Sequence, residues 1–166
     1  MLYYALLLAF PALVAFGAAY DLLTMTIPNR VSIALVALFL VVAVASGLSA
    51  EEILSHIAAG AIILVAGIIL FAVGGFGGGD AKLLAAAALW IGLEQLVPFL
   101  IYVTLFGGAL ALAILLYRKN PLVHPKAPDW AINLHKQGTG IPYGLAIASS
   151  ALLVFPQTAL FVATAI

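Results

Sequence analysis

Charged residues are so rare in this chain that long stretches of it contain none. Hydrophobic residues make up 66% of the 166 positions and charged residues 7%, against roughly 25% charged in an ordinary soluble domain. The charged side chains leave these charge-free intervals: Met1–Tyr20, Val31–Ala50, Ile53–Gly79, Leu83–Leu93, Gln95–Tyr117 and Gln137–Ile166. Most of them reach the roughly 18–20 residues needed to span a bilayer core. We therefore predict an all-α fold, a polytopic integral membrane protein.

Composition also excludes several kinds of chemistry. The sequence has no cysteine, which rules out disulfides, zinc–thiolate sites and cysteine nucleophiles. The formal net charge is zero, so there is no electrostatic basis for binding nucleic acid. We expect neither a metal nor a cofactor. The start of the chain lacks the positive charge of a secretory signal peptide, so we expect the first apolar run to be retained as a membrane helix.

The apolar runs predict about six membrane passes. The 37 residues Ala81–Tyr117 would measure about 55 Å as one helix, nearly twice the bilayer core of about 30 Å, so we divide them into two. The expected passes are Met1–Tyr20, Val31–Gly47, Ile53–Val73, about Asp80–Ile91, about Leu96–Tyr117 and Ile141–Thr164. The polar segment Arg118–Gly140 contains a possible short surface helix, Asp129–His135. With no internal repeat, we expect a single membrane-embedded domain over residues 1–166.

The charges agree with this count when the N-terminus is placed outside the membrane. All basic residues then lie on the inner side: Arg30, Lys82, Arg118, Lys119, Lys126 and Lys136. The acidic residues Glu51, Glu52 and Glu94 lie on the outer side. This arrangement satisfies the positive-inside rule without exception.

Two of the remaining acidic residues, Asp21 and Asp80, each lie at the end of an apolar run. Two complete passes separate them, so the chain returns to the same face and both carboxylates are expected at the inner side. Asp80 follows the glycine-rich run Gly74–Gly79, whose irregular backbone at membrane depth requires cover by protein or a water-filled cavity. Asp21 precedes the turn Ile27-Pro28-Asn29, with proline at an early position of the second helix.

The pairing of two carboxylates predicts aspartic proteolysis. Two carboxylates in a partly dehydrated site share a proton, with coupled pKa values. One can accept a proton from water as it attacks a peptide carbonyl, while the protonated partner donates to the carbonyl oxygen. The simpler alternative is that both are ordinary helix-end residues, with Asp80 capping the fourth helix and pairing with Lys82.

The sequence resembles the type IV prepilin peptidase family at three places. Asp21-Leu22-Leu23-Thr24-Met25-Thr26-Ile27-Pro28-Asn29 is similar to the motif of the family's first aspartate. Gly77-Gly78-Gly79-Asp80-Ala81-Lys82-Leu83 is similar to its GxGD motif. Ile141-Pro142-Tyr143-Gly144-Leu145-Ala146-Ile147 is similar to its C-terminal segment.

This resemblance implies an intramembrane aspartyl endopeptidase that removes the leader of prepilins and pseudopilins at the cytoplasmic face of the bacterial inner membrane. Asp21 and Asp80 would be catalytic. The residues implied to bind substrate or shape the site are Gly77, Gly78, Gly79, Pro28, Asn29, Lys82, Pro142, Tyr143 and Gly144. The substrate would have a short basic leader followed by one apolar helix, and membrane lipid would surround the enzyme.

The resemblance is closest to the short form of the family. Bifunctional members carry an N-terminal cytoplasmic extension with cysteine pairs and methylate the new N-terminus. Because Asp21 closes the first expected helix and the sequence has no cysteine, we expect no methyltransferase domain and a likeness to the Flp-type (tight adherence) peptidases.

Two other classes of function fit part of the pattern. A proton- or cation-coupled transporter would also use intramembrane acids and a glycine-broken helix, but it would place its acids near the midplane and show two related halves. A structural membrane subunit would leave the glycine run before Asp80 unexplained.

We assign structural or solvent-exposed roles to most of the other polar side chains. We expect His56 to be a neutral interfacial histidine, and Asp129 a solvated loop residue. His124 and His135 lie in the inner loop, within conceivable reach of the aspartates. We assign Lys82 mainly to anchoring the topology.

Overall fold

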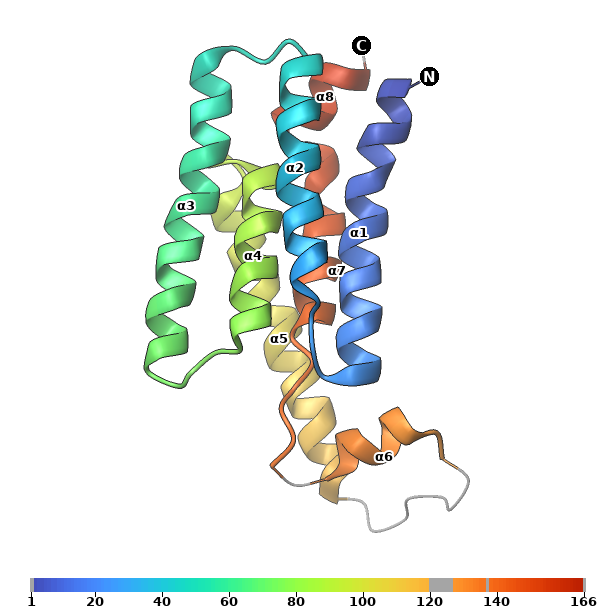
Figure 1. The fold of residues 1–166 in the computed structure, drawn as a ribbon. Helices are drawn as coiled ribbons and strands as arrows, with labels where there is room; N and C mark the ends of the chain where they lie inside the picture. The colour runs from blue at the N-terminus through green and yellow to red at the C-terminus, as the bar shows by residue number, and fades with distance from the viewer. Residues whose placement is uncertain (1, 120–126, 137, 166) are drawn as a thin grey trace.

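The computed structural model describes residues 2–119, 127–136 and 138–165, with side chains described for 8–119, 127–136 and 138–162. The described residues form helices and connecting turns, without a strand. The elements in chain order are α1 (Leu2–Thr24), α2 (Asn29–Ala45), α3 (Ala50–Ala72), α4 (Gly78–Ile91), α5 (Leu96–Lys119), α6 (Asp129–His135), α7 (Gly144–Val154), the 3₁₀ turn η1 (Phe155–Gln157) and α8 (Ala159–Ala165). The long helices run side by side as a bundle, and α6 lies across one end of it (Figure 1).

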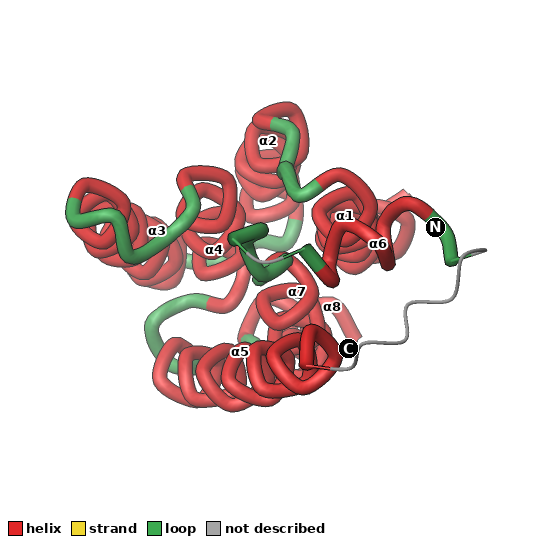
Figure 2. The backbone as a smooth tube through the Cα atoms, turned by 90° about the horizontal axis from the view of Figure 1, so that it is seen from below, coloured by secondary structure: helices red, strands yellow, loops and turns green. Residues whose placement is uncertain are grey.

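The short helix α4 lies at the centre of the bundle. It packs against α2, α3 and α7, with α1 and α5 further around it (Figure 2). From Leu83 to Ile91 every residue of α4 is buried. Small residues make the contact with α3 unusually close, because a Cβ added to Gly67 would lie 2.9 Å from the Cβ of Ala81. Such small-residue contacts are how helices in membranes approach closely.

An aromatic cluster joins the end of α4 to three other elements. The fully buried Trp90 stacks on Phe10 of α1 at a centroid distance of 4.8 Å and meets Phe39 of α2 and Phe155 of η1 edge to face. Its indole N–H donates a 2.9 Å hydrogen bond to the carbonyl of Leu35. A buried indole needs such a partner, so this cluster fixes the rotation of α4 as well as its depth.

Helices α2 to α6 begin and end within three residues of their predicted bounds. The first helix, however, extends to Thr24, so Asp21 lies inside its last turn rather than after it. The predicted continuous helix Ile141–Thr164 is wrong. Pro156 lacks the N–H that a helix interior requires, and the chain there forms η1 before α8 starts.

Much of the described surface of the bundle is apolar. Two helices, α3 and α5, are long and apolar enough to cross a bilayer, and three shorter apolar helical segments accompany them. Within the most apolar stretch of each of these helices, only 22% of α3 and 17% of α5 is buried in the protein. A soluble protein rarely exposes so much contiguous apolar surface. The all-α prediction is confirmed, and the helix composition is consistent with insertion in a membrane.

Candidate active site

Asp21 lies in the last turn of α1 and faces the start of α7. Its side chain is 5% exposed, and its Oδ2 accepts a 2.9 Å hydrogen bond from the backbone N–H of Gly144. The helix ends just beyond it, where Met25 adopts a positive φ of 57° and donates its N–H to the carbonyl of Asp21 at 2.7 Å. A left-handed residue is a common helix terminator. The end of α1 therefore presents a fixed, buried carboxylate to α7.

Asp80 lies in the first turn of α4 and is half-buried. The N-cap of this helix is Gly77, so the alternative in which Asp80 serves as the cap is not found. A Cβ added to Gly77 would lie 2.5 Å from Oδ2 of Asp80, which shows that the carboxylate folds back over the glycine backbone. The partial positive charge at the N-terminus of α4 favours a negative charge at this position.

The structure brings the two aspartates together, although they are separated by 59 residues of sequence. A Cβ on Gly79 would lie 3.3 Å from Cβ of Ile27, so the start of α4 packs against the turn that follows Asp21. The two carboxylates are near enough to interact electrostatically. Helix α7 packs on both α1 and α4 and supplies the third side of the site. Such a pair can share a proton between a donor and an acceptor.

The segment before α7 closes the site on that third side. Pro142 is buried, and Tyr143 lies between the glycine-rich loop and α5. The Tyr143 ring is 6.0 Å from that of Phe76 between centroids, and a Cβ on Gly107 would lie 3.0 Å from Tyr143 Cε1. Gly144 leaves room for the carboxylate, since a Cβ there would lie 2.9 Å from Asp21 Oδ2.

Arg118 holds the segment that leads into this wall, a role that sequence reasoning missed. Its Nε donates to the carbonyl of Leu134 at 2.7 Å, and its Nη2 donates to the carbonyls of Thr139 at 2.8 Å and Gly140 at 3.1 Å. In sequence, a basic residue at the end of an apolar run indicates only a membrane boundary. Because every residue has a backbone carbonyl, the residue types at these positions could not have revealed the hydrogen bonds of Arg118.

Lys82 and Asn29 join α4 to α2 at the same end of the bundle. Lys82 Nζ donates a 2.9 Å hydrogen bond to Asn29 Oδ1. Among the described residues Lys82 forms no ion pair with Asp80, so the alternative in which the two side chains pair is not found. Pro28 is the N-cap residue of α2, with φ of −62°, and orients Asn29 into the first turn. Gly78 packs against the ring of Phe71, because a Cβ added to Gly78 would lie 3.3 Å from Phe71 Cε2.

Of the described residues, His56, His135 and Asp129 make their contacts away from the aspartates. His56 is 3% exposed and its Nδ1 is bonded to the carbonyl of Leu89 at 2.8 Å, so its side chain is enclosed by the bundle, while its depth at the membrane interface stays a prediction. His135 packs edge to face on Tyr117, with centroids 5.2 Å apart. His124 lies outside the described residues, and Asp129 is an exposed residue at the start of α6. Among the described residues, no group of three His, Cys, Asp or Glu side chains could hold a metal.

Residues 8–112 match the Type IV leader peptidase family. This stretch is more than half of the chain and contains both aspartates. The chain therefore belongs to the Type IV leader peptidase family and is an aspartic prepilin peptidase, which confirms the predicted family and enzyme class. The segment around Pro142 lies beyond the matched residues. No curated protein and no solved structure matches the chain significantly.

Proposed function

We propose that this peptidase removes the leader of Flp-type prepilins and pseudopilins, with Asp21 and Asp80 as its two catalytic residues. The observation that carries the proposal is that the end of α1 with Asp21, the start of α4 with Asp80 and the start of α7 pack together at one end of the bundle. Family membership implies prepilin substrates. The Flp class is proposed from the resemblance to the short form of the family.

The chemistry needs one carboxylate as base and the other as acid. A water molecule between them gives a proton to the ionised carboxylate as its oxygen attacks the scissile carbonyl carbon. The protonated carboxylate gives its proton to the carbonyl oxygen, which yields a tetrahedral intermediate. Collapse of that intermediate breaks the C–N bond, and the amine leaves with a proton returned by the pair. The backbone N–H of Gly144 donates to Asp21 Oδ2 and so holds the Asp21 carboxylate in one orientation.

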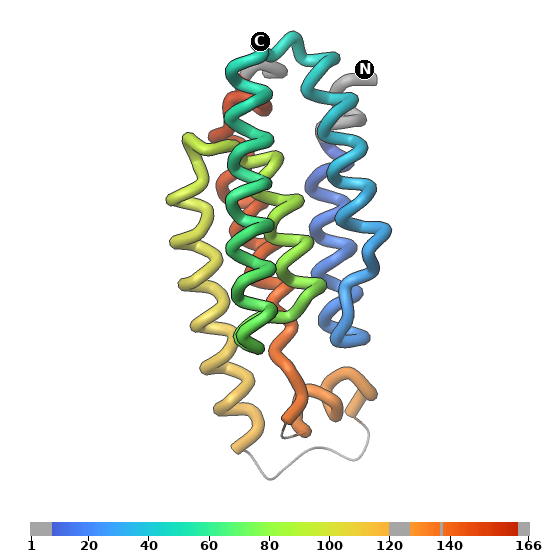
Figure 3. The backbone as a smooth tube through the Cα atoms, turned by 60° about the vertical axis from the view of Figure 1, so that its left-hand side comes forward, coloured from blue at the N-terminus to red at the C-terminus, as the bar shows by residue number. Residues whose placement is uncertain are grey.

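We propose six passes with the N-terminus outside and the aspartates at the cytoplasmic face of the inner membrane. The passes are α1, α2, α3, α4, α5 and the column formed by α7 with α8. Supporting this orientation, the described basic residues lie at the bundle end that carries α6, at the start of α2 and α4, the end of α5 and just after α6 (Figure 3). Glu51 and Glu52 lie at the opposite end, in the first turn of α3.

We also propose that residues 1–166 form a single peptidase domain that cleaves without methylating. Every helix except α6 contributes to one buried core that runs from Phe10 of α1 to Leu160 of α8. Such a core folds as one unit.

Co-expression with prepilins tests the proposed function. In a host without other prepilin peptidases, we expect this chain to shorten an Flp-type prepilin by its leader, seen as a size shift on a gel. Mass spectrometry of the product should show a free, unmethylated N-terminus. A longer type IV prepilin serves as the comparison substrate and should be cleaved more slowly. An Flp-type prepilin that keeps its leader beside stably inserted enzyme would contradict the proposal.

A further inference from the structure

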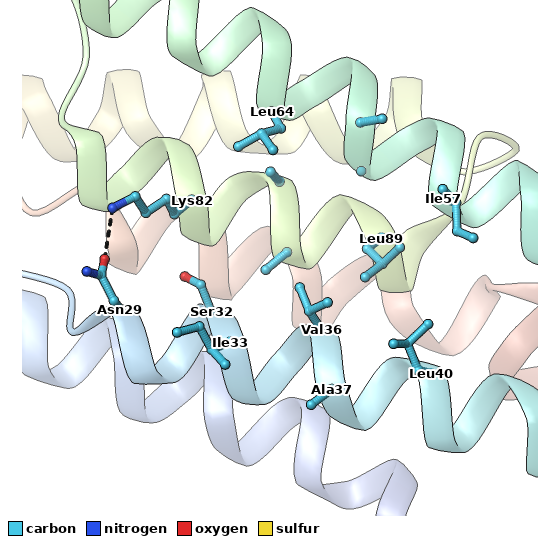
Figure 4. Close-up of a pocket in the computed structure, with 14 residues that line it drawn as sticks. Asn29, Ser32, Ile33, Val36, Ala37, Leu40, Ile57, Leu64, Lys82 and Leu89 are labelled. Atoms are coloured by element: carbon cyan, nitrogen blue, oxygen red, sulfur yellow. Dashed lines mark hydrogen bonds between the residues drawn. The ribbon is translucent and has the colours of Figure 1, made fainter.

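An open apolar groove runs along α4 between α2 and α3 (Figure 4). Its volume is about 760 Å³. Both α2 and α3 pack on α4, which forms the floor through the small side chains of Ala85 and Ala86. Val36 and Leu40 of α2 form one wall, and Leu64 of α3 belongs to the other. The groove opens sideways, toward the space that lipid would occupy.

One end of this groove is polar and adjoins the aspartates. Lys82 and Asn29 are hydrogen bonded there and line the groove. Lys82 lies two residues beyond Asp80 on the same helix, and Asn29 follows the Ile27-Pro28 turn that packs on Gly79. The polar end of the groove therefore lies beside the parts of α4 and α2 that adjoin the candidate active site.

A third polar group near this end has no partner. Ser32 Oγ, one turn along α2 from Asn29, is buried and makes no hydrogen bond within the described protein. A buried hydroxyl without a partner costs free energy, and in a bilayer no water is present to supply one.

We propose that this groove binds the apolar helix of the prepilin substrate, with the N-terminus of that helix at the polar end. The inference rests on the proposed function and specifies how its substrate is held. From Asn29 to Leu40 the α2 wall is about 16 Å long, which corresponds to three turns of a bound helix. The alanine floor allows a guest helix to approach the α4 backbone closely.

The polar groups favour a helix over a lipid chain as the occupant. The first turn of any helix has backbone N–H groups without intrahelical partners. Asn29 Oδ1 lines the groove at the depth where a substrate helix would begin and can accept a second hydrogen bond, and Ser32 Oγ lies one turn further along the same wall, covered by protein atoms until a side chain moves. An acyl chain offers no donor to either. The scissile bond just before that helix would then lie at the aspartates.

Cross-linking tests this placement, because the chain has no cysteine of its own. Val36→Cys in the groove, combined with Asp80→Asn to trap uncleaved substrate, is oxidised with a prepilin carrying a cysteine in its apolar helix. We expect a disulfide-linked heterodimer. The matched control is Leu112→Cys on α5, a position that is 59% exposed and outside the groove, and it should give at most one tenth of the product.

The other occupants are distinct outcomes of the same test. A disulfide between two copies of this chain through Val36→Cys would make the groove a self-association surface and overturn the inference. Equal cross-linking at both positions, or none at either, would leave the groove to lipid and also overturn it. In a parallel sample, the unmodified enzyme must cleave the same prepilin. If it does not, the proposed function fails, whatever the cross-links show.

Filling the groove gives a second, kinetic test. Ala37→Trp and Ala61→Trp place an indole in the groove, and we expect each to raise the KM for full-length prepilin at least tenfold. Leu105→Trp, at an exposed position of α5, adds the same bulk elsewhere and should leave the KM unchanged. Equal KM values for the three variants, each with an unchanged thermal midpoint, would contradict substrate binding in the groove.

Discussion

Each of the two aspartates lies against a glycine, at a position where a larger residue would clash with the carboxylate. Gly77 lies under the Asp80 carboxylate, and Gly144 both donates to Asp21 and stands in contact with it. The sequence indicated the two aspartates and the glycine-rich run, because those features are local. The bond from Gly144 to Asp21 spans 123 residues. Only the packing of α7 against α1 creates it.

Gly144→Ala should lower activity without unfolding the protein. Its new Cβ would stand 2.9 Å from Asp21 Oδ2, so the carboxylate must move. A displacement of about 1 Å in an active site can cost roughly 100-fold in rate, and we expect a loss of about 10- to 100-fold in kcat. Gly140→Ala is the matched control, since no atom lies within 4 Å of its Cβ position. Equal kcat values for the two variants would remove Gly144 from the site.

At the scale of elements, the sequence predicts the length of α4 but not its central position in the bundle. Its short length followed from dividing a 37-residue apolar stretch in two. That it would be surrounded by other helices did not follow, since an alanine-rich run fits a lipid-facing or a buried helix equally well. The break at Pro156 had a visible signal, but an apolar run predicts membrane depth and says little about helical continuity.

Gly67→Ala should destabilise the protein by separating α3 from α4. The added methyl would lie 2.9 Å from the Cβ of Ala81 and 3.3 Å from its Cα. Overpacking of this kind costs about 1–3 kcal/mol, which thermal unfolding in detergent will show as a lower midpoint.

Gly108→Ala on α5 is the control for that substitution. No atom lies within 4 Å of its Cβ position, and alanine favours a helix interior over glycine by about 0.5–1 kcal/mol. We expect an unchanged or slightly raised midpoint. If Gly67→Ala behaved the same way, the close packing of α3 on α4 would be wrong.

At the scale of the molecule, charge placement predicts sidedness but not the arrangement of the helices. The positive-inside rule needs only the order of residues along the chain. Which helices touch depends on side-chain fit, such as Trp90 against Phe10, and on small residues such as Gly67. These contacts have no signal in composition, so the meeting of α1 with α4 became visible only in the structure.

Labelling in intact cells tests the proposed orientation. A cysteine at Ala50, at the start of α3, should react with an impermeant thiol reagent added from outside. A cysteine at Ala127, just before α6, should be protected until the membrane is opened. The reverse pattern would place the aspartates at the outer face and contradict cleavage at the cytoplasmic side.

The most direct test of the account is processing by single aspartate variants. Asn at position 21 can still accept the Gly144 N–H bond, and Asn at position 80 has nearly the shape of Asp, so both variants should insert and fold. Neither can exchange a proton, and general acid–base catalysis contributes about 100- to 10,000-fold. In a prepilin cleavage assay we therefore expect Asp21→Asn and Asp80→Asn each to lose at least about 100-fold in rate, while Asp129→Asn cleaves like the unmodified enzyme. Cleavage at the unmodified rate by either Asp21→Asn or Asp80→Asn would contradict the two-aspartate mechanism.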